Sequence, residues 1–249
     1  MLFTIVEIVV VTLGCCAASV HYLHALQMGR YQLPAYRQWL SKNRDRILKG
    51  NVLVAFIAAL MRMYLPVLLS MFLKEEAFRS TLSAWLVLLG FTGLMAWTAW
   101  RDYTRPSKRP FVVTQRVRRL LTVLFLLSLL LCSLMSLMKP VSVSPYFLYA
   151  LMPFMVLLSA RIIEPYETRL NASFFKSARK KVREHKNLIT VGITGSYGKT
   201  NVKFILRDIL SKKYKVLATP ASFNTAMGIS RVVNDQLKPE HLKIKKIIL

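Results

Sequence analysis

One segment governs the expectations for this chain: Val191-Gly192-Ile193-Thr194-Gly195-Ser196-Tyr197-Gly198-Lys199-Thr200. An apolar run from Leu188 to Ile193 enters it, as expected of a buried strand. A helical spacing of apolar residues follows it, at Val202, Ile205, Leu206, Ile209 and Leu210. Strand, glycine turn and helix together predict a loop whose backbone N–H groups converge on phosphate, reinforced by the positive end of the helix.

Two side chains in this loop have predicted roles. We expect Lys199 to reach the β- and γ-phosphates and the Thr200 hydroxyl to ligate Mg²⁺. The match to G-x-x-x-x-G-K-[ST] is imperfect, because Ile193 stands where the pattern has its first glycine and Gly192 comes one residue too early. A glycine-rich turn without a ligand is the alternative interpretation. The strand before the loop and the helix after it favour nucleotide binding.

Composition points to a membrane. Apolar residues make up 54% of the chain while its formal net charge is +25, a combination typical of apolar spans with basic flanks. Segments long enough to cross a bilayer as helices, which takes about 20 residues each, lie at residues 2–26, 52–73, 82–100, 120–138 and 141–163. The first lacks the basic start and small-residue cleavage site of a signal peptide, so we interpret it as a retained span.

The connecting loops predict an orientation. The loops after the first and third spans are strongly basic, and the other loops carry few basic residues. Basic loops stay in the cytoplasm. We therefore expect a multi-pass plasma-membrane protein over residues 1–163, with the N-terminus outside and the phosphate loop facing cytosolic ATP.

Residues 164–187 are predicted to form a basic juxtamembrane linker. They include Arg169, Lys176, Arg179, Lys180, Lys181, Arg183 and Lys186, and Phe174, Ala178 and Val182 follow one helical face. The anionic lipid of the inner leaflet is the expected partner. Nucleic acid is the alternative for such charge, but no base-reading module accompanies it, so no nucleic-acid partner is predicted.

Polar residues inside the spans have two interpretations. Arg62, followed one turn later by Pro66, is a lipid or substrate contact, a partner for Glu7, or a sign that the bounds of this span are wrong, and we favour the last two interpretations over the first. No metal site is predicted at the cysteines or histidines, which lack ligand spacing: Cys15, Cys16, Cys132, His21, His24, His185 and His241.

After the glycine loop and its helix, the pattern alternates again. Lys215–Thr219 is a predicted strand, Thr219 to Ile229 a loop entering a helix, and Ile244–Leu249 a last strand. The predicted fold class is a multi-span α-helical membrane region followed, over residues 188–249, by the start of an α/β P-loop domain with a parallel sheet.

The C-terminal quarter resembles the Mur ligase family. The resemblance is carried by Gly192 to Thr200 and, about twenty residues on, by Thr219-Pro220, Asn224-Thr225 and Gly228-Ile229. The form T-G-S-x-G-K-T is most similar to the ligases that add D-alanyl-D-alanine to the muramyl tripeptide. It covers roughly residues 187–249 and says nothing about the five spans.

This resemblance implies an ATP- and Mg²⁺-dependent amide ligase of cell-wall synthesis. Residues 188–249 would form the first part of its central ATP-binding domain. Such a ligase activates a substrate carboxylate as an acyl phosphate, which an amine attacks; the partner would be a carboxylate-bearing peptide or a UDP-muramyl-peptide-like molecule. Lys199 would be the catalytic residue and Thr200 the Mg²⁺ ligand. Nucleotide contacts would come from Thr194, Gly195, Ser196, Tyr197, Gly198, Lys199, Thr200 and Asn201, and substrate-side contacts from Thr219, Asn224 and Thr225. Asn224 could equally be a helix cap.

The sequence contains only part of what the family's members have. The acidic magnesium ligand, a further lysine, the C-terminal domain and the UDP-sugar-binding domain of the family have no counterpart here. We therefore expect an incomplete product that binds nucleotide without completing catalysis alone. The alternatives are a membrane-anchored nucleotide-binding module without chemistry, a ligase like those of poly-γ-glutamate synthesis, and a transporter with an ATP-binding tail, which the lack of internal repeats disfavours.

Overall fold

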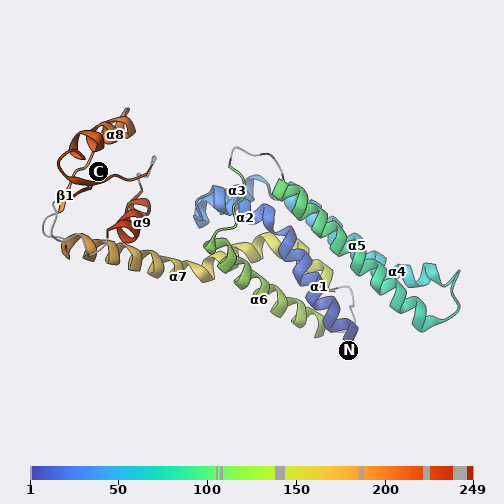
Figure 1. Cartoon of the computed structure of the whole chain (residues 1–249). Helices are drawn as coiled ribbons and strands as arrows, with labels where there is room; N and C mark the ends of the chain where they lie inside the picture. Colours follow the sequence, from blue (N-terminus) through green and yellow to red (C-terminus); the bar gives the residue numbers. More distant parts are fainter. Residues whose placement is uncertain are drawn as a thin grey trace. The chain divides into compact units, whose positions relative to one another are not determined.

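The structure, a computed structural model, describes residues 2–104, 106, 109–137, 144–184, 188–220, 225–237 and 246–248, with the backbone alone at residues 2, 46, 48 and 246–248. The chain divides into two compact units, Met1–Glu164 and Pro165–Leu249 (Figure 1). Helices dominate both.

The first unit is a helical bundle. Its elements are α1 (Leu2–Ala18), α2 (Val20–Met28), α3 (Leu33–Lys42), α4 (Arg44–Leu69), α5 (Glu76–Thr104), α6 (Gln115–Leu137), the 3₁₀ turn η1 (Ser144–Phe147) and the first part of α7 (Leu148–Glu184). Within the described residues, five helices are long and apolar enough to cross a membrane, as many as the sequence predicts: Phe3–Met28, Lys49–Leu69, Glu76–Thr104, Gln115–Ser136 and Pro145–Glu184.

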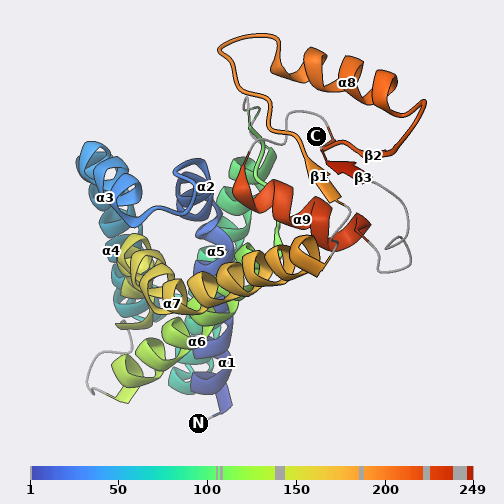
Figure 2. The same cartoon turned by 90° about the vertical axis from the view of Figure 1, so that its left-hand side faces the viewer.

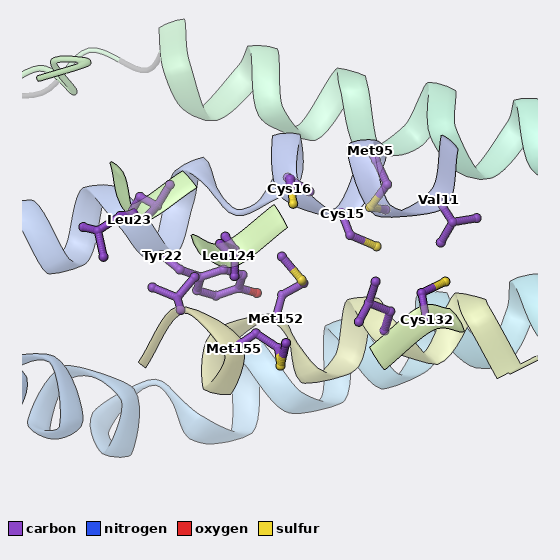
Figure 3. Close-up of a cluster of buried hydrophobic side chains, with 14 of the residues drawn as sticks. Val11, Cys15, Cys16, Tyr22, Leu23, Met95, Leu124, Cys132, Met152 and Met155 are labelled. Carbon is purple, nitrogen blue, oxygen red and sulfur yellow. The ribbon is translucent and has the colours of Figure 1, made fainter. Parts of the chain in front are cut away.

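One apolar cluster fills the centre of this bundle, where α1, α5, α6 and α7 meet (Figure 3). Its fully buried members include Val11, Met95, Leu124 and Met152. Gly14 of α1 faces α5, where a Cβ at this position would lie 3.5 Å from the Met95 Cβ, an ordinary van der Waals distance. Small residues at such contacts are typical of helices that associate in lipid, where van der Waals packing replaces the hydrophobic effect.

A polar contact is buried within the same bundle. The Tyr146 hydroxyl donates a hydrogen bond of 2.9 Å to Glu7 Oε1, and Arg62 Nε lies 3.9 Å from the same oxygen. The interpretation of Arg62 as the partner of Glu7 is confirmed. A charged side chain within a span is costly unless it is paired, so the three side chains form one unit.

The second unit comprises the C-terminal part of α7, then β1 (Leu188–Thr190), α8 (Lys199–Leu210), β2 (Lys215–Leu217), α9 (Ala226–Gln236) and β3 (Lys246–Ile248) (Figure 2). Its core is small: Ala178 on α7, Val233 on α9 and Leu237, with three partly buried neighbours, Val182, Leu188 and Leu217. The Asn234 amide donates a hydrogen bond of 3.1 Å to the Phe174 carbonyl and so ties α9 to α7.

The predicted fold class of this unit is wrong. In the described residues the strands β1, β2 and β3 have three residues each, in the order β1-β3-β2 with parallel pairing. Strands of the usual length have about 5–6 residues. The apolar face of α8 is not packed on a sheet, since Val202, Ile205 and Ile209 are 50–60% exposed. The unit consists of helices joined by short strand pairings. It is not a P-loop domain built on a parallel sheet.

Candidate functional site

The glycine loop lies between β1 and α8. Gly198 is the N-cap of α8 with φ of +75°, and Gly195 has φ of +155°. Side chains rarely adopt these backbone angles, so glycine is required where the chain turns into the helix. The Val202 N–H donates to the Gly198 carbonyl at 2.9 Å, which closes the first helical turn. No side chain caps this end of α8, and the N–H groups of its first turn are the donors an anion would meet.

Lys199 is the first residue of α8, and its side chain folds back over the loop. Its Nζ donates to the Gly195 carbonyl and, at 3.3 Å, to the Ser196 carbonyl. The ammonium is therefore held by backbone oxygens at the centre of the turn. A phosphate placed there would meet the ammonium and the amide donors of the helix end together.

The other predicted contact residues surround this turn. Thr194, Ser196, Tyr197, Thr200 and Asn201 are all exposed, and Tyr197 is 96% exposed. Thr200 and Asn201 fall in the first turn of α8, beside the donors. The structure thus brings together the whole predicted nucleotide set, from Thr194 to Asn201, on one accessible turn.

The donor set fits a phosphate better than it fits a free metal ion. The glycine backbone and Lys199 provide positive partial and full charge, while Thr200 provides a single hydroxyl oxygen for Mg²⁺. Mg²⁺ in nucleotide sites takes its remaining ligands from phosphates and water. Among the described residues, no three His, Cys, Asp or Glu side chains gather to hold a metal ion.

Thr219 connects the second resembling segment to α8. Its carbonyl accepts a hydrogen bond of 2.6 Å from Lys203 Nζ, and its hydroxyl lies 3.3 Å from the same atom. Both residues are buried, at 7% exposure each. The loop after β2 is therefore attached to α8 one turn beyond Lys199.

Sequence reasoning missed Lys203. A lysine on a helix is ordinarily solvated, and the residues around it carry no signal that the ammonium would be buried. Its burial depends on the loop after β2 folding onto α8. Its Nζ also lies 4.8 Å from the Phe204 ring centre, so the ammonium has an aromatic face as well as backbone oxygen beside it.

The remaining predicted loop residues lie at the start of α9. The Thr225 hydroxyl accepts a hydrogen bond of 3.1 Å from the Gly228 N–H, which caps this helix. Asn224, for which a cap or a substrate contact was expected, lies outside the described residues. His185 and His241 also lie outside them.

Comparison with known proteins gives one partial similarity. Over 42 residues the chain is 50% identical to the UDP-N-acetylmuramoyl-tripeptide--D-alanyl-D-alanine ligase of Treponema pallidum (strain Nichols). The match takes in 17% of this chain and 9% of that protein. No family model matches the chain, and no solved structure matches it. The similarity to this ligase is confined to a short segment, which covers less than a tenth of that relative's length.

Proposed function

We propose that this chain is the membrane-anchored, nucleotide-binding part of an ATP-dependent Mur-type amide ligase that acts on a peptidoglycan or related peptide-polymer precursor. The observation that carries the proposal is the turn from Gly195 to Thr200, with the Lys199 ammonium folded over it at the N-terminus of α8. The 42-residue similarity to a D-alanyl-D-alanine-adding ligase supports the choice of reaction class.

In this proposal the chain's own residues bind and orient a triphosphate. The amide donors of the loop and the first turn of α8 hold phosphate oxygens, and Lys199 leaves the Gly195 and Ser196 carbonyls to neutralise the β- and γ-oxygens. The Thr200 hydroxyl contributes one oxygen to Mg²⁺. Bound ATP would supply the phosphoryl group that activates a substrate carboxylate for attack by an amine. Positioning and charge neutralisation are the main tasks of a protein in phosphoryl transfer.

The proposal includes a membrane topology. Five spans would place the two ends of the chain on opposite sides of the bilayer. The basic residues of α3 and of the first turns of α4 and α6 favour the cytoplasm for that end of the bundle. The N-terminus would then lie outside and the glycine loop in the cytoplasm. A reporter fused after residue 249 should be active in the cytoplasm, and activity only outside the cell would contradict this topology.

Photolabelling of the full chain in detergent with 8-azido-ATP tests nucleotide binding. Lys199→Ala should weaken labelling by about 10- to 100-fold, since hydrogen bonds to charged groups contribute about 1.5–3 kcal/mol. Lys212→Ala is the matched control, because it removes an exposed lysine beyond the other end of α8. Labelling that both variants reduce equally, or that neither reduces, would contradict the proposal.

A further inference from the structure

A polar cavity lies at one end of the helical bundle, outside the nucleotide site. It has a volume of about 290 Å³ and mixes charged, amide and aromatic side chains from α2, α3, α4, α5 and α7. Its principal lining residues are His21, Tyr22, Trp39, Asn51, Arg101 and Asp102. Such a combination of apolar walls and a few polar groups is typical of a ligand site.

The polar side chains of this cavity are held in place by one another. The Asp102 carboxylate lies 3.3 Å from the Arg101 guanidinium and 3.8 Å from His21 Nδ1. Asn51 is buried and donates a hydrogen bond of 2.7 Å to the Tyr22 hydroxyl. The cavity therefore has a fixed polar lining in which the carboxylate is already paired and the Arg101 side chain remains 45% exposed.

A second cavity lies further along α4 and α5. It has a volume of about 320 Å³ and is lined entirely by apolar residues and one glycine. Its lining residues are Val54, Ile57, Ala58, Met61 and Leu65 on α4, and Leu86, Val87, Gly90, Phe91 and Leu94 on α5.

The two cavities follow the same helix faces. On α4, Ile47 and Asn51 of the polar cavity continue as Val54, Ala58, Met61 and Leu65 of the apolar one, at three- and four-residue spacing. On α5, Arg101 and Thr98 continue in the same way as Leu94, Phe91 and Val87. Residues so spaced share one face of a helix. From Ile47 to Leu65 the shared face measures about 27 Å at 1.5 Å per residue, comparable with the hydrocarbon core of a bilayer.

The charge around the polar end favours an anionic ligand. Arg37, Lys42, Arg44 and Lys49 belong to α3 and α4 at this end. The segment before α6 joins them, since His24 Nε2 lies 2.9 Å from the Arg109 carbonyl and Gln27 donates to the Val112 carbonyl at 3.0 Å. The described carboxylates here are Asp45 and the paired Asp102. Basic groups therefore outnumber acidic ones around the opening.

We propose that these two cavities together bind one phospholipid of the surrounding bilayer, with its phosphate head group in the polar cavity beside Arg101 and an apolar chain in the cavity between α4 and α5. A bilayer lipid fits because both cavities are lined from α4 and α5, which are long and apolar enough to cross a membrane. The guanidinium supplies a charge-assisted donor for phosphate, and the groove supplies an unbroken apolar wall for the chain. The site does not depend on nucleotide binding.

Native mass spectrometry of the full chain in detergent tests the site with four probes: dioleoyl phosphatidic acid, farnesyl phosphate, dioleoyl phosphatidylcholine and inorganic phosphate. We expect phosphatidic acid to bind one per chain, at least about tenfold more tightly than phosphatidylcholine or inorganic phosphate. Farnesyl phosphate binding more tightly than phosphatidic acid would overturn the choice of a bilayer phospholipid. Phosphatidylcholine binding as tightly as phosphatidic acid would overturn the proposed head-group site, and inorganic phosphate binding as tightly would overturn the role of the groove.

Paired variants then test the location. Gly90→Leu should fill the groove and weaken amphiphile binding about tenfold, while Gly93→Leu should not, although both glycines lie on α5 with open space around the added Cβ. Arg101→Gln should weaken binding about tenfold by removing the charged donor, and Arg79→Gln at the other end of α5 should leave it unchanged. Equal effects within both pairs, or none in either, would overturn the assignment.

Discussion

The two units of the chain stabilise their helices in different ways. The first unit, Met1–Glu164, has one large apolar cluster and a buried polar contact among Glu7, Arg62 and Tyr146. The C-terminal unit has a small apolar core, and hydrogen bonds from Lys203 and Asn234 connect its segments. The exposed apolar side chains of the two units also differ, because those of the first unit lie mostly on helices apolar enough to span a bilayer, whereas those of α8 lie outside the candidate spans. We therefore expect substitutions of polar groups to have large effects in both units for different reasons.

The largest expected effect is in the first unit. Glu7→Ala removes the acceptor for Tyr146 and leaves the Arg62 charge uncompensated, which should lower the free energy of unfolding by about 3–5 kcal/mol. Thermal unfolding in detergent, followed by size-exclusion chromatography, measures the loss. The double variant Glu7→Ala with Arg62→Met should recover part of it. A double variant no more stable than Glu7→Ala would contradict the pairing.

The corresponding change in the C-terminal unit is expected to be smaller. Lys203→Ala leaves the buried Thr219 carbonyl without its donor, at a cost of about 1–3 kcal/mol. Limited proteolysis should then cut the chain near Thr219 faster than in the unsubstituted protein. The control is Lys213→Ala, which removes an exposed lysine beyond the end of α8. Equal cleavage rates in the two variants would show that Lys203 does not hold this loop.

A pH-dependent effect of about 1 kcal/mol is expected at Tyr36 on α3. Its buried hydroxyl donates a hydrogen bond of 3.0 Å to the Pro153 carbonyl, and burial raises the pKa of Tyr36. The unfolded tyrosine ionises near pH 10. Because the folded pKa is higher, the stability from this group is fully present below about pH 10 and is lost as the pH rises above it. Tyr36→Phe should be less stable than the unsubstituted protein at about pH 8, and its free energy of unfolding should fall less as the pH rises above about 10. The free energy of unfolding, measured with a chemical denaturant from about pH 9 to about pH 11, covers the range around the unfolded tyrosine pKa. An equal decrease in this free energy for Tyr36→Phe and the unsubstituted protein would contradict the assignment.

The smallest expected effect is at the start of α9. Thr225→Ala removes the cap on the Gly228 N–H and should cost about 1 kcal/mol, with Thr225→Ser retaining most of the stability. Hydrogen exchange at the first turn of α9 measures it. Equal exchange in the two variants would mean that the hydroxyl contributes no cap.

Hydropathy predicted the long helices of the first unit, because a bilayer span requires about 20 apolar residues and the described residues include five such helices. The pairing of Arg62 with Glu7 was also predictable, since an ionised group within a span needs a partner. The cavity that opens among His21, Trp39 and Arg101 was not, because it depends on how α2, α3 and α5 pack together.

Prediction was weaker in the C-terminal unit. The apolar run Leu188 to Ile193 indicated a strand, but only Leu188–Thr190 of this run pair in the structure. The apolar spacing of α8 correctly indicated a helix, but its apolar side chains at Val202, Ile205 and Ile209 are exposed and not packed on the three short strands. The glycine loop itself was predictable, since Gly195 and Gly198 adopt backbone angles that other residues disfavour. Lys203 was not, because tertiary contact with Thr219 decides its burial.

Hydrogen–deuterium exchange of the full chain with and without Mg-ATP tests the central claim most directly. We expect protection concentrated in the loop from Thr194 to Gly198 and the first turn of α8, with the first unit unchanged, and we expect Lys199→Ala to abolish that protection. Exchange in this segment that Mg-ATP leaves unaltered, or protection that persists without Lys199, would contradict the assignment of the loop as a phosphate-binding site.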